Sequence, residues 1–275
     1  MRTLVVADLH YSLPQYDWLV AQAPYFDLVI LAGDHVDLSS PVDGPAQIVV
    51  LGKYLDLLRQ ATRVITCSGN HDLDSRDARG EKTSAWIEGL SGNGVPADGE
   101  SVMLDDTLIT ICKWWDGPLA QAELGEQLAR DAERPKKHWH WVHHAPMHDS
   151  ATSWSGSRSM GDMALKTWIE EFAPDMVYSG HIHHTPFVPN GSWVDRIGKT
   201  WVFNVGQHLG VPPPHIMIDS DKNEAVWMSM AGIQCVRLDQ PLERPIHYIN
   251  MPPEWVTSLE KVPYPNPDRS FAPVD

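Results

Sequence analysis

The feature that most constrains the fold is a short apolar run with a polar end that recurs along the first part of the chain. Residues 4–7 are apolar and rich in β-branched Val, which is typical of a strand buried on both faces in a parallel sheet. The run ends abruptly in Asp8-Leu9-His10. Taken alone, this segment favours a polar strand end with a capping Asp. The rest of the chain changes that interpretation.

The same pattern returns twice, with a helical segment before each return. Residues 27–31 are predicted to form a second strand that leads into Gly33-Asp34-His35-Val36-Asp37, and residues 63–67 a third that leads into Ser68-Gly69-Asn70-His71-Asp72. Apolar spacing predicts helices over 13–23 and 45–59. The order indicates a βαβαβ unit with a parallel sheet. Because the carboxyl ends of parallel strands meet at one edge, we expect the polar ends to lie together.

The second half repeats the pattern less regularly. A hairpin is predicted over 101–112, a helix over 119–134, and a strand over 138–143 that ends in His143-His144. A helix over 162–172 precedes a strand over 176–178, which leads into Gly180-His181-Ile182-His183. Further strands are expected over 200–204, 215–219 and 225–230.

The composition changes near the C-terminus. From residue 238 onward the chain is rich in Pro and polar residues with little periodicity. We therefore expect a domain over 1–235 and a tail over 236–275. The tail either wraps the domain or meets a partner, and a homo-oligomer could form through it.

Charge and composition exclude several classes of protein. The formal net charge of −15 argues against broad binding to nucleic acid or to acidic membranes. It does not exclude an anionic substrate, since a local metal centre can invert the field inside one cleft. No apolar stretch is long enough for a membrane-spanning helix, and a strand at the N-terminus leaves no room for a signal peptide. The three scattered cysteines are typical of reduced thiols, which predicts a cytoplasmic protein.

The polar strand ends together suggest a metal site. Imidazole and carboxylate in one mixed set suit Zn, Mn, Fe or Co. The set is too large for one tetrahedral ion, but it suits two ions that share a bridging carboxylate and keep positions open for water and substrate. The absence of Cys argues against a closed structural zinc site. The residues concerned are Asp8, His10, Asp34, Asp37, Asn70, His71, His143, His181 and His183.

These segments resemble a known family. Asp-x-His, Gly-Asp-x-x-Asp, Gly-Asn-His-Asp, His-His-x-Pro and Gly-His-x-His, in this order between residues 8 and 183, are similar to the motifs of the calcineurin-like metallophosphoesterases. The resemblance implies an α/β fold in which a mixed β-sandwich is flanked by helices. The Pro-rich tail matches nothing in that family.

The resemblance also implies a role for each residue. One metal would be held by Asp8, His10 and His183, and the other by Asn70, His143 and His181, with Asp34 as the bridge. Of the pair His143-His144, the first is the expected ligand. His71 would be the catalytic imidazole that does not bind metal, and Asp37 would orient it.

The implied activity is hydrolysis of a phosphoester bond, most simply a phosphodiester, in a small substrate. Hydroxide bridging two ions (Mn, Fe or Zn) would attack phosphorus in line, while His71 stabilises or protonates the leaving oxygen. The three-His pattern resembles the bacterial branch that includes cyclic-nucleotide and glycerophosphodiester phosphodiesterases. Arg158 is a candidate for gripping a phosphate oxygen, and His144 for touching the substrate.

Three alternatives remain open at this point. A phosphomonoesterase, including a protein phosphatase, would use the same metal centre, and a nuclease is disfavoured by the charge. A non-catalytic interaction scaffold, like the metallophosphoesterase-like subunit of retromer, is the alternative from another class. Specificity would lie in the segments 76–100 and 147–161, which no motif constrains.

Overall fold

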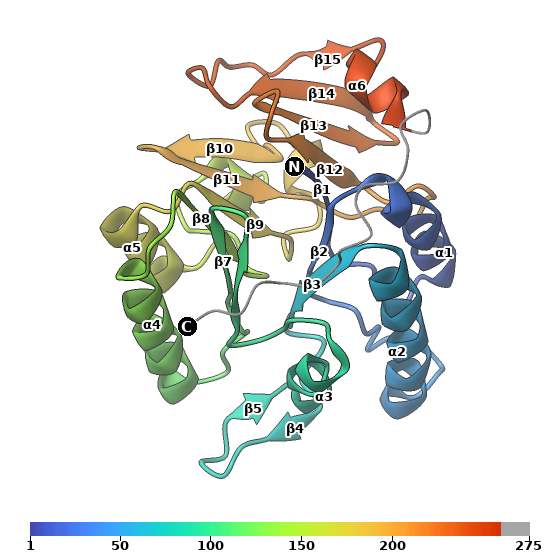
Figure 1. Cartoon of the computed structure of the whole chain (residues 1–275), viewed down its shortest axis with the longest axis vertical. Coiled ribbons are helices and arrows are strands. Elements are labelled where there is room, and N and C mark those ends of the chain that lie inside the picture. The colour runs from blue at the N-terminus through green and yellow to red at the C-terminus, as the bar shows by residue number, and fades with distance from the viewer. Residues whose placement is uncertain (260–275) are drawn as a thin grey trace.

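The computed structural model, which describes residues 1–259, contains two β-sheets packed face to face. The larger sheet has the strand order β15-β14-β13-β12-β1-β2-β3, and the smaller has the order β10-β11-β9-β8-β7-β6. In Figure 1 the strands β1 to β3 lie to the right of β7 to β9, with the N-terminus between the two halves. A further pair, β4 and β5, forms a two-stranded sheet.

The first half of the chain builds the βαβαβ unit that the sequence predicts. It contains β1 (Arg2–Val6), α1 (Leu13–Gln22), β2 (Leu28–Ala32), α2 (Gly44–Ala61) and β3 (Arg63–Cys67). The three strands are parallel, with Leu4 opposite Val29 and Val29 opposite Val64. They are buried almost throughout because helices cover one face and the second sheet covers the other.

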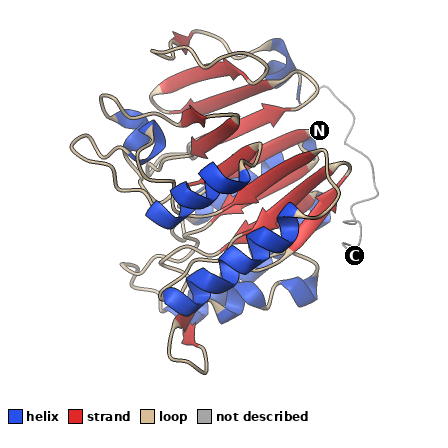
Figure 2. Cartoon of the chain, turned by 90° about the vertical axis from the view of Figure 1, so that its left-hand side faces the viewer, coloured by secondary structure: helices blue, strands red, loops and turns tan. Residues whose placement is uncertain are grey.

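The smaller sheet has the same parallel character at its centre. Its elements are β6 (Ser101–Leu104), β7 (Thr107–Ile111), α4 (Pro118–Ala132), β8 (His138–Val142), α5 (Met163–Phe172), β9 (Met176–Ser179), β10 (Val194–Ile197) and β11 (Thr200–Asn204). Strands β7, β8, β9 and β11 run parallel, while β6 and β10 add antiparallel edges. Figure 2 shows α4 and α5 crossing in front of this sheet.

Three clusters of buried side chains correspond to these layers. One cluster, which includes Ile30, Tyr178 and Trp227, fills the space between the sheets. A second lies between the larger sheet and the helices α1 and α2, and a third lies under α4 and α5. The arrangement is helix, sheet, sheet, helix. The predicted fold class, a mixed β-sandwich flanked by helices, is confirmed.

The chain returns to the larger sheet after β11. Strands β12 (His215–Asp219), β13 (Glu224–Ser229), β14 (Gly232–Arg237) and β15 (Tyr248–Ile249) extend it antiparallel from β1, and α6 (Glu254–Thr257) follows. The boundary expected after residue 235 falls inside β14. Trp255 is buried in the cluster beside α1 and α2. Residues 260–275 of the expected tail lie outside the described residues.

The smaller elements lie in the connections. Strands β4 (Ser75–Arg76) and β5 (Lys82–Thr83) and helix α3 (Ala85–Glu88) lie below both sheets in Figure 1. Short 3₁₀ turns span Ala23–Tyr25, Ser91–Asn93, Ala151–Ser153 and Thr185–Phe187. Over residues 1–259, no helix has the length and apolar character needed to cross a bilayer.

Candidate metal centre

The loops that follow β1 and β2 run side by side at the carboxyl edge of the larger sheet. The main-chain N–H of Asp8 donates to the carbonyl of Gly33 at 3.0 Å, and that of His10 donates to the carbonyl of Asp34 at 3.1 Å. The N–H of Tyr11 donates to the carbonyl of His35 at 2.7 Å. The loop after β9 joins them, since the N–H of His181 lies 3.0 Å from a carboxylate oxygen of Asp8. Hydrogen bonds between main chains thus hold these loops in fixed positions.

Two glycines allow this close approach. A Cβ atom on Gly69 would lie 2.1 Å from Oδ1 of Asp34, and one on Gly180 would lie 2.2 Å from Oδ2 of Asp8. Any other residue at either position would displace a carboxylate. The loops are also strained, because Asp8, His10, Asp34 and His181 all have positive φ angles between 41° and 67°. Such strain in residues with side chains is concentrated at functional sites.

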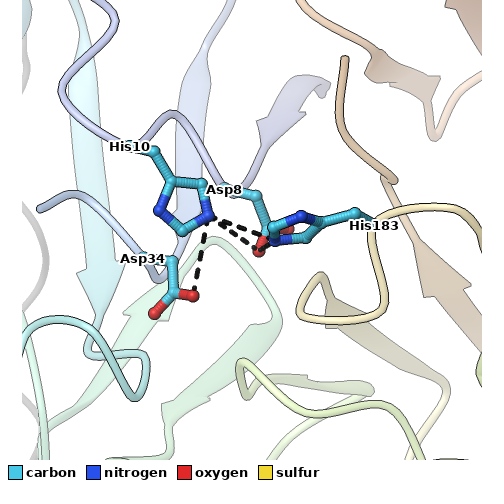
Figure 3. A group of neighbouring side chains, drawn as sticks. All are labelled: Asp8, His10, Asp34 and His183. Carbon is cyan, nitrogen blue, oxygen red and sulfur yellow. Dashed lines mark hydrogen bonds and ion pairs between the residues drawn. The ribbon is translucent and has the colours of Figure 1, made fainter. Parts of the chain in front are cut away.

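Four side chains converge on one point between these loops (Figure 3). Atoms of Asp8, His10, Asp34 and His183 lie within 4.8 Å of one another. The Nε2 atoms of His10 and His183 are 3.1 Å apart, and Nε2 of His183 is 3.1 Å from Oδ1 of Asp8. Nε2 of His10 is 3.8 Å from Oδ2 of Asp34. Several lone pairs directed at one point are the arrangement that a bound cation requires.

The ring of His10 has the tautomer that a ligand needs. Its Nδ1 lies 3.3 Å from the main-chain carbonyl of Val36, so Nδ1 carries the proton in a hydrogen bond to that oxygen. Nε2 then presents its lone pair to the carboxylates. A carbonyl that fixes the outer nitrogen of a histidine is usual around metal ligands.

A second group shares Asp34 with the first. Asp34, His144 and His181 place ligand atoms within 4.8 Å of one another. Nδ1 of His144 donates to the carbonyl of Ala32 at 2.7 Å, which turns Nε2, the other ring nitrogen, toward Asp34. That Nε2 is buried 3.1 Å from Oδ2 of Asp34 but is not in hydrogen-bonding geometry. A buried nitrogen with no hydrogen-bond partner is costly, and a cation would satisfy it.

His144, rather than His143, takes the place next to Asp34. The His143 ring stacks on the indole of Trp115 at 4.6 Å with an interplanar angle of 4°. Its Nδ1 lies 3.5 Å from the carbonyl of Cys112, and its Nε2 is buried without a partner. The ligand atoms that lie together around Asp34 come from His144 and His181, and His143 is not among them. His144, which the sequence assigned to substrate contact, is fully buried behind the site.

Asn70 and His71 lie on the loop after β3, against the shared carboxylate. The main-chain N–H of His71 donates to Oδ1 of Asp34 at 2.9 Å. The His71 ring makes an edge contact with His10 at 4.6 Å, and its Nε2 is 3.9 Å from Oδ2 of Asp34. The side-chain carbonyl oxygen of Asn70 is buried and accepts no hydrogen bond from residues 1–259, so its lone pairs are available to a cation.

Two residues that the sequence proposed, Asp37 and Arg158, are in neither group of ligand atoms. The Asp37 carboxylate accepts a hydrogen bond from the N–H of Ser39 at 2.8 Å, so it caps its own turn. The ring nitrogen Nδ1 of His71 has no hydrogen-bond partner within the described residues, so Asp37 does not hold that ring. Arg158 is exposed, with its Nε 3.1 Å from the sulfur of Met160, and it does not line the cleft described below.

The electrostatics of the two histidines after β8 differ sharply. Burial alone would lower the pKa of His144, but Asp34 and Asp8 raise it to about 9. Burial alone would likewise raise the pKa of Asp34, yet His144 and His71 hold it well below its usual range. For His143, burial lowers the pKa to about 3. The negative field of the carboxylates is thus directed at His144 and not at His143.

A cleft of about 270 Å³ opens over the first group. His10, His71 and His183 form its floor, and Asp37 and Leu209 belong to its walls. The remaining lining residues are Leu9, Ser12, Gln15, Ser39 and Gln207. A small molecule that enters the cleft from solvent can therefore reach the side chains of His10, His71 and His183.

The fold and this centre together define a class of protein. Two groups of N and O ligand atoms share the carboxylate of Asp34, so the residues fit two cations. The chain belongs to the calcineurin-like phosphoesterase family, which residues 1–185 match. As its name says, this is a family of phosphoesterases.

Solved structures share this fold at low sequence identity. The Thermus thermophilus protein TT1561 is 13% identical with a TM-score of 0.52, over 86% of this chain and 98% of that chain. Purple acid phosphatase PPD1 from yellow lupin is 12% identical with a TM-score of 0.53, over 90% of this chain and 52% of that chain. No curated protein matches the sequence significantly.

Proposed function

We propose that this chain is a metal-dependent hydrolase that cleaves phosphodiester bonds in small substrates. The observation that carries the proposal is that Asp34 belongs to both groups of ligand atoms. A carboxylate shared in this way brings two cations close together, and dinuclear centres of this kind catalyse hydrolysis of phosphoesters.

In this proposal each ion is bound by three residues of its own and by the shared carboxylate of Asp34. Asp8, His10 and His183 hold one ion and Asn70, His144 and His181 the other, with Asp34 between them. When bound, the two ions (Mn, Fe or Zn) supply Lewis acidity for the phosphate and lower the pKa of a coordinated water. The ligand after β8 differs from the one that the sequence favoured, because Nε2 of His144 and not of His143 faces Asp34.

His71 is the residue proposed to handle the proton. Its ring lies in the lining of the cleft, next to His10, and it stays outside both ligand groups. The main-chain N–H bonded to Asp34 fixes the loop that carries it. His71 can therefore donate a proton to the leaving oxygen from the cleft side, a contribution of about 10²–10⁴-fold for general acids. Asp37 lines the same cleft, and we propose that its carboxylate contacts water or the substrate there and does not orient the His71 ring.

The charge of the cleft supports a diester substrate. Among the described residues that line it, none is Lys or Arg, and Asp37 adds a negative charge. A phosphomonoester dianion carries more charge than a diester monoanion, and Arg or Lys side chains are common partners of such phosphate oxygens. The lining therefore favours the substrate with the smaller charge.

The test compares hydrolysis of bis(4-nitrophenyl) phosphate with that of 4-nitrophenyl phosphate by protein loaded with Mn²⁺. We expect the diester to be hydrolysed with the larger kcat/KM. His71→Asn is expected to keep both ions and lose about 10²-fold or more in kcat. Preference for the monoester would contradict the diester proposal. Two bound ions with turnover of neither ester would favour an interaction scaffold.

A further inference from the structure

One residue of the cleft wall has no role in the chemistry above. Leu209 lines the cleft together with His10, His71 and His183, and its side chain is 89% exposed. An isolated exposed leucine needs no explanation, but this one belongs to a group. Val211 is 50% exposed and Met230 is 74% exposed, and the Met230 sulfur lies against Gly210. Together Leu209, Val211 and Met230 form an apolar rim beside the cleft.

The loop that carries Leu209 is held firmly in place. The buried side chain of Gln15, on α1, donates to the carbonyls of His208 and Gly210, both at 2.8 Å. Nε2 of His208 accepts from the N–H of Met230 at 3.2 Å. The N–H of Gln207 donates to the carbonyl of His183 at 2.9 Å, which fixes the loop relative to a metal ligand. These hydrogen bonds fix the loop, so the exposed side chain of Leu209 has a defined position at the cleft.

We propose that Leu209, with Val211 and Met230 beside it, binds an alkyl group of the phosphodiester substrate. This inference rests on the proposed function and names its substrate class, a diester with one aliphatic ester group. The lining residues provide no cation for a second phosphate, and the rim offers apolar surface where the substituent must leave the cleft. Covering an exposed leucine with an alkyl chain removes apolar surface from water on both partners.

Calorimetry on the metal-loaded protein tests this with alkyl(methyl)phosphinates as probes, because they carry the single negative charge of a diester and both of their P–C bonds resist hydrolysis. The alkyl chain is lengthened from methyl to hexyl. We expect the Kd to fall about threefold for each added methylene until the rim is covered. In Leu209→Gln this dependence on chain length should largely disappear. Leu57→Gln, at a leucine on α2 that is 48% exposed and outside the cleft, should keep the full dependence.

Each contrary result has its own meaning. A Kd that does not change with chain length in the natural protein would overturn the inference and leave the proposed hydrolysis intact. Absence of diester turnover by that protein would overturn the proposed function. If light scattering shows that Leu209→Gln converts an oligomer to a monomer and the chain-length dependence persists, the rim is a contact between copies of this chain, and the inference is wrong.

Discussion

The two proposed metal sites depend on the pair of residues Asp34 and His144. The alternation of β8 explains why His144 is the partner. Trp139 and Trp141 face the helices of the outer layer, whereas Val142 belongs to the core between the sheets. Alternate residues of a strand face the same side, so His144 points inward like Val142, and His143 points outward like Trp139 and Trp141.

The matched substitutions His143→Phe and His144→Phe separate the two histidines. We expect His144→Phe to reduce the bound metal from two ions to one per chain, because it removes the nitrogen that faces Asp34. His143→Phe should retain both ions, since a phenyl ring can keep the stack on Trp115. Elemental analysis of protein loaded with Mn²⁺ gives the stoichiometry. Loss of an ion only in His143→Phe would reverse the assignment.

The sequence alone did not decide which of His143 and His144 is the ligand. The order of motifs placed a ligand after β8 without deciding between adjacent histidines. The period-2 alternation over His138 to Val142 decides it once the faces of the strand are known. Which face is inner depends on where the second sheet lies, and no local pattern gives that. The hydrogen bond from the N–H of Ser39 to the Asp37 carboxylate likewise depends on the geometry of the loop, which a sequence motif does not give.

At the scale of elements, the loops after β2 and β3 are joined by Asp72. Its carboxylate accepts hydrogen bonds from the N–H groups of His35 at 2.9 Å, Val36 at 3.1 Å and Gly69 at 2.8 Å. The side chain is 1% exposed, so these bonds are shielded from water. Asp72 thereby sets the distance between the loop that carries Asp34 and the loop that carries Asn70 and His71. The sequence placed Asp72 in a motif but gave it no role.

Asp72→Asn should loosen this connection. An amide cannot accept from all three N–H groups, so at least one buried donor loses its partner, at a cost of about 1–3 kcal/mol in the free energy of unfolding. We also expect weaker metal binding, measured by calorimetry. Asp74→Asn is the control, because the Asp74 carboxylate accepts from the N–H of Ala85 on α3 and does not join the two loops. Equal loss of metal affinity in both variants would argue against the connecting role.

Most of the long elements were predictable, and the short ones were not. Buried parallel strands are continuous apolar runs, so β1, β2 and β3 stood out in the sequence. Strand β10 has the sequence Val-Asp-Arg-Ile and β14 carries Gln234 and Arg237, so neither has a clear apolar pattern. They are strands because neighbouring strands pair with them, which is tertiary information.

At the scale of the molecule, each sheet buries a neutral histidine outside the metal centre. His140 on β8 and His215 on β12 are 7% and 3% exposed. Burial lowers the pKa of each to about 4. An unfolded histidine has a pKa near 6.5, so between about pH 6.5 and pH 4 the unfolded chain binds more protons than the folded one. Their contribution to stability is complete above pH 6.5 and is lost as the pH falls toward 4.

His140→Gln should therefore flatten the acid side of the stability curve. In the natural protein, His140 alone accounts for a loss of about 3 kcal/mol over this range. Glutamine can keep a hydrogen bond to the hydroxyl of Tyr178, which lies 3.2 Å from Nδ1 of His140. Urea unfolding at a series of pH values from 7 to 4 measures the difference in slope. Parallel curves for the two proteins would show that His140 does not titrate on unfolding.

The position of β1 has a consequence for how the chain is made. β1 lies between β2 and β12, with Arg2 opposite Asp219. All seven proposed ligands have left the ribosome by residue 183, yet the first strand gains its second neighbour only when residue 219 has emerged. Pairing across so much sequence is slow, because the loop must close before any contact forms. The nascent chain thus holds a complete set of ligands before its larger sheet exists, and chaperones or early metal capture would act in that interval.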